Sequence, residues 1–175
     1  MALNIQNDLG TTEDANSYVD GAYYVSYMAD RDITIEYTTA EEIAQVDGAL
    51  IQATSYIDTA NKYCGEKLNG RDQTTAFPRS PLTDNDGYDV EGVPREIKEA
   101  QCEYAYIYTE QGTLQPNQNV NGSVKRTKEK VDVIEEEVEY TGSGQTGSKI
   151  SYPIADNKIP KAFICGGSDG YFVRA

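Results

Sequence analysis

A capped apolar stripe over residues 39–60 constrains the fold of this chain most. Thr39 and Glu42 have the spacing of a capping box, in which each side chain bonds an amide at the start of a helix. Six apolar residues then recur in steps of three and four: Ile43, Val46, Leu50, Ala53, Ile57 and Ala60. This pattern predicts a helix with one narrow stripe that packs on another helix, ending before Gly65. The partner is either a helix of the same chain, which we favour because three short heptads are marginal alone, or a second copy in a coiled coil.

Two further helices are expected beside it. Asp20 can cap a helix over about residues 21–30, and Pro94 suits the first turn of a helix over 95–111, which Gly112 ends. Residues 65–94 between the last two helices are rich in Gly, Pro, Asp and Asn, which predicts a long loop. The sequence therefore predicts a mainly α protein, with a small bundle of three main helices over residues 1–113.

The composition changes after residue 113, and we expect an extended C-terminal arm over residues 114–175. A polar linker at 115–122 leads into a predicted strand at 123–140, and a Gly- and Ser-rich tip at 141–148 precedes a return strand at 149–154. Neither face of the long strand is cleanly apolar, so we expect this hairpin and the rest of the arm to lie outside the monomer core. Apolar residues near the chain end would dock on other subunits or partners: Phe163, Ile164, Tyr171 and Phe172.

The charge is strongly acidic and unevenly distributed. The net charge is -14, and residues 1–120 hold 7 basic and 21 acidic residues, whereas residues 121–175 hold 8 of each. This balance disfavours binding to an exposed nucleic-acid backbone, but it is compatible with DNA passing through a channel, where an acidic wall would prevent the DNA from sticking. Hydrophobic residues are only 38% of the chain and Tyr numbers 14. A modest core with many Tyr side chains favours a protein stabilised by neighbouring copies, the alternative being a small Tyr-rich monomer.

Catalytic and metal-binding patterns are missing from the sequence. The chain has no His, so Ser-His and Cys-His nucleophile pairs cannot form within it. The Gly-rich stretch at 166–170 lacks the Lys-Ser/Thr of a phosphate-binding loop, and we interpret it as a turn. The stretch 84–87 resembles the start of an EF-hand calcium loop, which needs a Glu at its twelfth position. Counted from Asp84, the twelfth position is Arg95, so only a loose calcium-binding turn remains as an alternative. We expect no enzyme activity, no catalytic residues, no cofactor and no metal.

Cysteine usage and hydropathy indicate an intracellular protein. Cys64, Cys102 and Cys165 are odd in number and lack C-x-x-C spacing, so we expect three reduced thiols. The N-terminal residues do not resemble a signal peptide, and no apolar stretch approaches membrane-spanning length. We therefore expect no membrane association.

Arg71 and the stretch 77–79 form a basic and aromatic patch within the long loop. Phe77, Pro78 and Arg79 have two interpretations: contact with a neighbouring subunit or DNA, or an anchor in which Phe77 fills the core and Arg79 pairs with a carboxylate. We favour the anchor, because an Arg on an acidic protein readily finds a carboxylate.

Four short sequence patches are separated along the chain, at residues 15–19, 49–58, 70–80 and 93–105. Their order and their spacing, taken together, are more specific than any one patch. Their cores read Ala-Asn-Ser-Tyr-Val, Ala-Leu-Ile-Gln-Ala-Thr-Ser-Tyr-Ile-Asp, Ala-Phe-Pro-Arg-Ser and Ala-Gln-Cys-Glu-Tyr-Ala. Together they resemble the tailed-phage head-to-tail connector, or adaptor, proteins, whose relatives are often labelled DnaT-like single-stranded-DNA-binding proteins.

The resemblance implies a virion structural protein. It implies a homo-oligomeric ring of twelve copies under the portal protein, in contact with a tail or nozzle protein. Such a ring would lie in the neck between capsid and tail, after assembly in the host cytoplasm, and would let genomic DNA pass without specific binding.

The alternative function is a DnaT-like single-stranded-DNA-binding replication protein. Such a protein needs aromatic residues interleaved with basic ones along a groove. The dense basic run, Lys125, Arg126, Lys128 and Lys130, contains no aromatic residue, so the sequence favours the adaptor.

Overall fold

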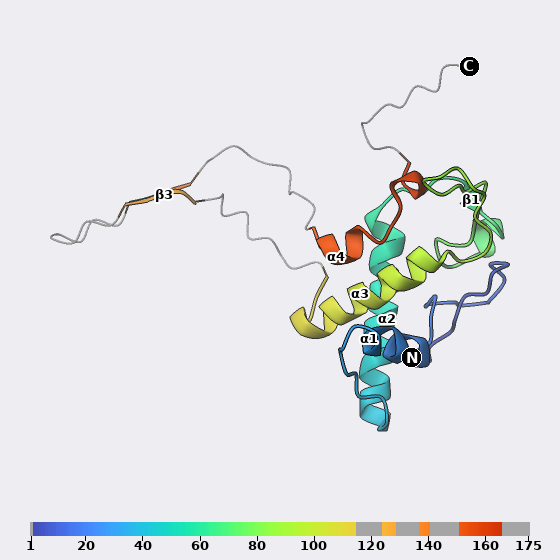
Figure 1. Cartoon of the computed structure of the whole chain (residues 1–175), viewed down its shortest axis with the longest axis horizontal. Coiled ribbons are helices and arrows are strands. Elements are labelled where there is room, and N and C mark those ends of the chain that lie inside the picture. The colour runs from blue at the N-terminus through green and yellow to red at the C-terminus, as the bar shows by residue number, and fades with distance from the viewer. Residues whose placement is uncertain (1, 115–123, 129–136, 141–150, 166–175) are drawn as a thin grey trace, which may run out of the picture. The chain divides into compact units, whose positions relative to one another are not determined.

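The computed structural model describes residues 2–114, 124–128, 137–140 and 151–165, with backbone alone for 124–128 and 137–140 (Figure 1). The chain divides into two compact units. We call the first, built from residues up to 114 and from 152 onward, the helical unit, and the second, residues 115–151, the hairpin unit.

The helical unit contains α1 (Gly21–Ala29), α2 (Ala40–Ala60), α3 (Arg95–Gln111) and the short α4 (Pro153–Asp156). The predicted mainly α fold is confirmed. The capping box is present, because the Thr39 hydroxyl accepts from the Glu42 amide at 3.3 Å and the Glu42 carboxylate accepts from the Thr39 amide at 2.9 Å. Gly112 ends α3 at φ 73°, a left-handed conformation that suits Gly.

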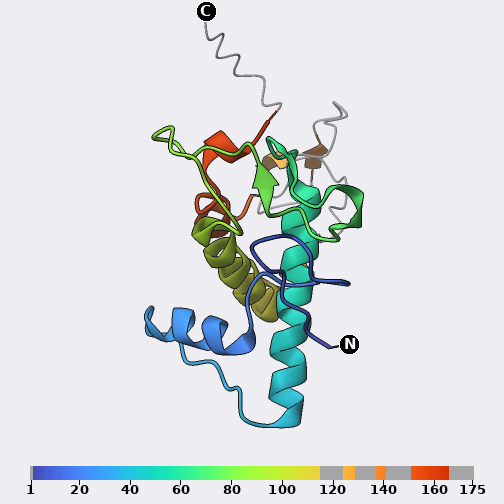
Figure 2. The same cartoon turned by 90° about the vertical axis from the view of Figure 1, so that its right-hand side faces the viewer.

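The apolar stripe of α2 packs within the same chain. Leu50, Ala53 and Ile57 are fully buried, and α3 supplies the buried Ile97 and Tyr104. Figure 1 shows α3 crossing α2, and Figure 2 shows α2 running along the helical unit with α1 (blue) to one side of it and roughly perpendicular to it. The preferred expectation of an intramolecular helix pair is confirmed, and the stripe is covered by the chain's own residues.

The loop at 65–94 is ordered by a small sheet and by side chains that enter the core. Strand β1 (Glu66–Lys67) pairs antiparallel with β2 (Arg79–Ser80), and the 3₁₀ turn η1 (Gly70–Asp72) lies between them. Gly65 adopts φ +65°, and a Cβ there would lie 2.3 Å from the Pro81 carbonyl oxygen. Only Gly therefore fits where the chain leaves α2 and approaches β2.

The hairpin unit contains β3 (Val124–Lys128) paired antiparallel with β4 (Glu137–Tyr140). A hairpin is present, but the expected single strand over 123–140 is wrong, because that stretch folds back on itself. The register explains this: Arg126 lies opposite Glu139 and Lys128 opposite Glu137, so the basic and acidic halves face each other as oppositely charged cross-strand pairs. The predicted tip at 141–148 lies outside the described residues, and a return strand through 149–154 is wrong because α4 begins at Pro153.

The stretch from Tyr152 to Phe163 belongs to the core of the helical unit. Ala155 and Phe163 are fully buried, Ile159 nearly so, and the Tyr152 hydroxyl donates to the Leu114 carbonyl at 3.0 Å. The expectation that all residues after 113 lie outside the monomer core is therefore wrong for this stretch. Its apolar side chains complete a core that the three main helices leave open, since the Tyr152 ring packs edge-on against those of Tyr56 and Tyr104.

Candidate functional site: the cross-linked loop region

The structure gathers three of the four sequence patches, those at 15–19, 49–58 and 93–105, around the buried side chain of Gln101. Its Nε2 lies within hydrogen-bond distance of Ser17 Oγ (2.7 Å), Thr54 Oγ1 (2.8 Å) and the Leu50 carbonyl (3.0 Å). Its Oε1 accepts from the Tyr18 amide at 3.0 Å. Gln101 is completely buried and all these partners are internal, so the patches specify a polar core rather than an exposed site.

A second buried pair joins the N-terminal segment to α2 and the long loop. The Tyr18 hydroxyl donates to Asp58 Oδ1 at 2.5 Å and accepts from the Phe77 amide at 3.2 Å. Burial raises the pKa of Asp58 to about 6, although hydrogen bonds from Tyr18 and the Ala76 amide and the charge of Lys67 oppose the shift. Burial and the nearby Asp58 also raise the pKa of Tyr18. Sequence reasoning missed this pair; the available signal was an acidic residue, Asp58, directly after Ile57 of the apolar stripe.

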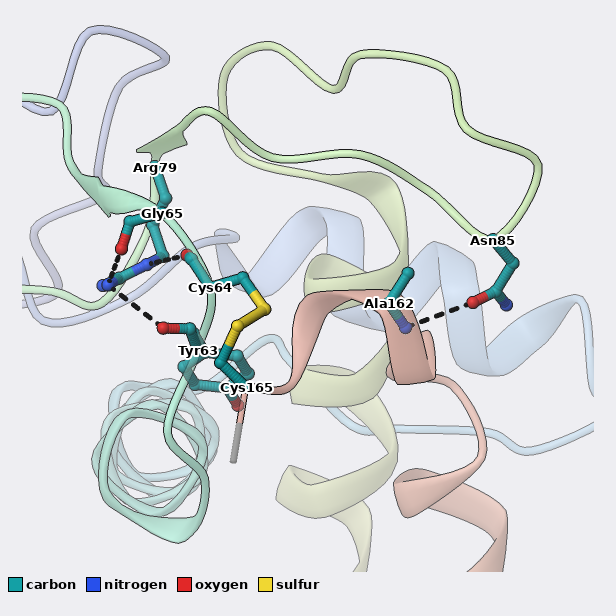
Figure 3. Close-up of a disulfide and its surroundings, with 7 residues drawn as sticks. All are labelled: Tyr63, Cys64, Gly65, Arg79, Asn85, Ala162 and Cys165. Atoms are coloured by element: carbon teal, nitrogen blue, oxygen red, sulfur yellow. Dashed lines mark hydrogen bonds between the residues drawn. A yellow bond between two sulfur atoms is a disulfide. The ribbon is translucent and has the colours of Figure 1, made fainter. Parts of the chain in front are cut away.

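A disulfide joins Cys64 to Cys165 across 101 residues of sequence (Figure 3). The expectation of three reduced thiols is wrong for these two, and Cys102 alone is free and buried. The backbone explains the pairing: the Cys64 amide donates to the Phe163 carbonyl at 2.9 Å, and the Cys165 amide donates to the Lys62 carbonyl at 2.8 Å. This antiparallel bridge brings the two residues side by side, which sequence spacing could not reveal.

Arg79 fastens the loop beside the disulfide. Its guanidinium donates to the carbonyls of Cys64 (2.6 Å), Gly65 (2.5 Å), Tyr63 (3.3 Å) and Ala76 (3.2 Å), three of which are drawn or labelled in Figure 3. The anchor interpretation therefore describes Arg79, with one correction: its hydrogen-bond partners are backbone carbonyls and not a carboxylate. A planar group with five donors suits such a set of acceptors.

The other residues suggested as partner contacts differ in accessibility. Phe77 and Phe163 are completely buried and their rings lie 6.2 Å apart, so neither presents a surface to a partner. Arg71 is exposed and Ile164 is half-buried. Tyr171 and Phe172 lie outside the described residues.

The described Lys and Arg side chains of the helical unit are few, and most of them are bound to carboxylates or backbone carbonyls of the same unit. Residues 2–114 hold seven Lys or Arg and 21 Asp or Glu, and residues 151–165 hold two and one. Arg31 contacts Glu103 at 3.2 Å, and Arg95 and Lys158 contact Glu99 at 3.4 and 2.8 Å. Lys67 donates to the Gln73 carbonyl, and Arg79 binds carbonyls as above. Five of nine cations are thus held inside the unit, which leaves a sparse basis for binding phosphates.

The turn at 84–87 is held by its own backbone. Asp84 Oδ1 accepts from the amides of Asp86 and Tyr88, both at 2.9 Å, as in a self-contained Asx turn. Within the described ranges no group of three His, Cys, Asp or Glu side chains is placed to hold a metal ion. Among the helices described, none combines the length and apolarity needed to cross a membrane.

Comparison with known proteins gives one family. Residues 1–175 match the family described as "Putative DnaT-like ssDNA binding protein", and the chain belongs to that family. No curated protein and no solved structure matches the chain.

Proposed function

We propose that this protein is a non-enzymatic virion subunit, a head-to-tail adaptor that forms a ring under a portal protein and lets genomic DNA pass. The observation that carries the proposal is the division into a helical unit with its own core and a hairpin unit. The described sheet of the hairpin unit has only two strands, β3 and β4. An isolated two-stranded sheet is marginal in water, so the hairpin unit gains most from strands or surfaces of other copies.

The charge of the helical unit supports the same proposal. An acidic surface with most of its described cations engaged repels a DNA backbone, as the wall of a channel should. The proposed partners are further copies, in a ring expected to be twelve-fold, with the portal on one side and a tail or nozzle protein on the other. The proposed location is the neck of the virion, after assembly in the host cytoplasm.

Single-stranded-DNA binding is the second candidate, and the description of the matched family favours it over the adaptor. On this chain, phosphate contacts would fall to Lys125, Arg126 and Lys128 of β3. Tyr23 offers an exposed ring that stacks on Tyr27, although Glu99 and Glu103 lie beside these rings. The weight of charge opposes this candidate, because base stacking in such proteins accompanies a basic groove.

Two measurements on the full chain separate the candidates. Fluorescence anisotropy with labelled oligo-dT at about 150 mM salt should give no dissociation constant below about 10 µM. Such a value lies within the range of non-specific binding at this salt. Native mass spectrometry, alone and with a portal protein, should show a closed oligomer or a portal complex. Micromolar or tighter DNA binding that falls steeply with salt, and that is lost on replacing Lys125, Arg126 and Lys128 by Glu, would favour the replication protein.

A further inference from the structure

The rest of the helical unit holds the two ends of the Cys64–Cys165 disulfide very differently (Figure 3). Cys64 is half-buried and comes shortly after the end of α2. Arg79 donates to the three consecutive carbonyls of residues 63–65, which fixes the backbone around Cys64. Cys165 is exposed and is the last residue of the described C-terminal stretch. Cys64 therefore belongs to a fixed part of the fold, whereas a short segment carries Cys165.

The segment over residues 160–165 docks through a small set of described contacts. Phe163 is completely buried, and the antiparallel bridge described above joins the segment to residues 62–64 by two backbone hydrogen bonds. The Ala162 amide also donates to the exposed Asn85 Oδ1 at 3.2 Å. A few contacts of this kind can open locally while the helices stay folded. The disulfide prevents such opening, because it ties the end of the segment to a fixed residue.

The third cysteine of the chain does not compete for this bridge. Cys102 lies on α3, is completely buried and is free. Burial raises the pKa of its thiol, and the thiolate is the form that takes part in disulfide exchange. Because the sequence contains three cysteines, thiol chemistry gives the protein two states, one with the bridge and one with two free thiols in its place.

We propose that the Cys64–Cys165 disulfide is a reversible redox latch, which a dithiol reductant opens so that residues 160–165 can detach while the helical unit stays folded. A thiolate of the reductant attacks the exposed Cys165 sulfur, the bond between the cysteine sulfurs breaks, and Cys64 leaves as a thiolate that takes a proton from water. The second thiolate of the reductant then displaces the Cys165 sulfur, which also takes up a proton. The protein has gained two electrons, and the reductant has become a cyclic disulfide.

Opening of the latch would uncover part of the aromatic core. The ring of Phe163 lies 6.2 Å from that of Phe77, whose ring lies 4.7 Å from that of Tyr63, and all three are buried. Withdrawal of Phe163 would expose the other two rings to water on one side. The latch involves the helical unit alone, so the inference goes beyond the proposed function and applies to either candidate.

Hydrogen exchange measured by NMR on the full chain tests the latch, with the oxidised protein compared with the protein reduced by dithiothreitol. The reporters are the amides of Cys64 and Cys165, which donate across the antiparallel bridge. The reference is the Tyr18 amide, which donates to Gln101 inside the core. We expect reduction to accelerate exchange at the two reporters at least about tenfold more than at the reference, as a local opening would. Oxidised glutathione should restore the original rates.

Two variants separate the latch from other effects of the reductant. The double variant Cys64→Ser/Cys165→Ser should show the fast exchange of the reduced protein with or without dithiothreitol. Cys102→Ser, which keeps the bridge, should respond to dithiothreitol as the natural protein does. In the reduced folded protein, N-ethylmaleimide should label Cys64 and Cys165 before the buried Cys102.

Three results would overturn the inference. Equal acceleration at the two reporters and at Tyr18 would show that the disulfide only stabilises the fold as a whole. Unchanged exchange on reduction would show that the docked segment does not need the bridge. Loss of the cooperative unfolding transition in both the reduced protein and the double variant would also count against the latch, which requires two folded states. None of these results depends on whether the chain forms a ring or binds DNA.

Discussion

At the residue scale, Asp58 links the stability of the fold to pH. Its pKa in the folded state is about 6, above the ordinary 3.8, because burial disfavours the charged form. The folded state therefore binds this proton more tightly than the unfolded state does. The contribution is fully present below pH 3.8 and is lost as the pH rises through 6.

Replacing Asp58 by Asn should remove that pH dependence. A shift of about two pKa units corresponds to about 3 kcal/mol as an upper bound. The unfolding free energy of the natural protein should thus fall, relative to Asp58→Asn, by up to that amount between pH 4 and 7. Urea denaturation at several pH values measures this, with the exposed Asp72→Asn as the control. Parallel pH profiles for the natural and Asp58→Asn proteins would contradict the assignment.

Arg79 should resist even conservative replacement. Lys keeps the charge but has three donors on a single nitrogen, so it cannot reach four carbonyls spread around a planar group. We expect Arg79→Lys to lower the unfolding free energy by about 2 kcal/mol, given the usual worth of hydrogen bonds from charged donors. Arg71→Lys, at an exposed position of the same loop, should change it by less than about 0.5 kcal/mol. Similar losses in both variants, measured by thermal denaturation, would show that the carbonyl contacts do not hold the loop.

Sequence reasoning succeeded for residues whose role depends on local pattern and failed where distant segments meet. Phe77 was expected in the core as part of the preferred anchor interpretation of the stretch 77–79, and it is completely buried. The contacts of Arg79 with residues 63–65, the Tyr18–Asp58 pair and the disulfide all join segments more than ten residues apart. Only the fold determines such neighbours.

At the scale of elements, α2 is the central helix of the structure. Leu50 lies in the middle of its stripe, is completely buried, and accepts from Gln101 through its carbonyl. Leu50→Asp places a carboxylate there without a partner, which costs several kcal/mol and is comparable to the whole stability of a small domain. We expect loss of the cooperative unfolding transition in circular dichroism. Gln52→Asp, on the exposed face of the same helix, should keep it.

The helices were predictable because caps, periodicity and stops agree along each segment. The hairpin was only partly predictable. Residues 123–140 have β-like composition throughout, and composition cannot show where a strand reverses. The register of β3 and β4 shows that the reversal lies between them, because it sets basic residues opposite acidic ones. The short α4 was missed because four residues give no periodic signal.

At the scale of the whole molecule, the division into two units predicts what can be removed. Excising residues 115–151 and joining Leu114 to Tyr152 by a short Gly-Ser linker should preserve the fold, because the Tyr152 side chain already contacts the Leu114 carbonyl. We expect a cooperative thermal transition within a few degrees of the parent.

Truncation after Leu114 is the informative counterpart. It removes the buried Phe163 and Ile159 as well as the disulfide, and loss of a buried Phe alone costs about 3–5 kcal/mol. The truncated protein should be unfolded or molten in circular dichroism. A well-folded truncated protein would show that the last part of the chain adds little to the core.

The disulfide also sets how the molecule would bear mechanical load. Tension entering beyond residue 165 has a covalent route through the sulfur bridge to Cys64, just past the end of α2. Force directed toward the N-terminus along that route bypasses residues 65–164, so the long loop, α3, the hairpin unit and α4 are shielded from the pull. In the reduced protein the same tension would act directly on the backbone before residue 165. It would therefore first pull the side chain of Phe163 out of the core. Oxidation thus ties Cys165 to Cys64, close to the end of α2, so that pulling on the C-terminal end no longer extracts Phe163 from the core.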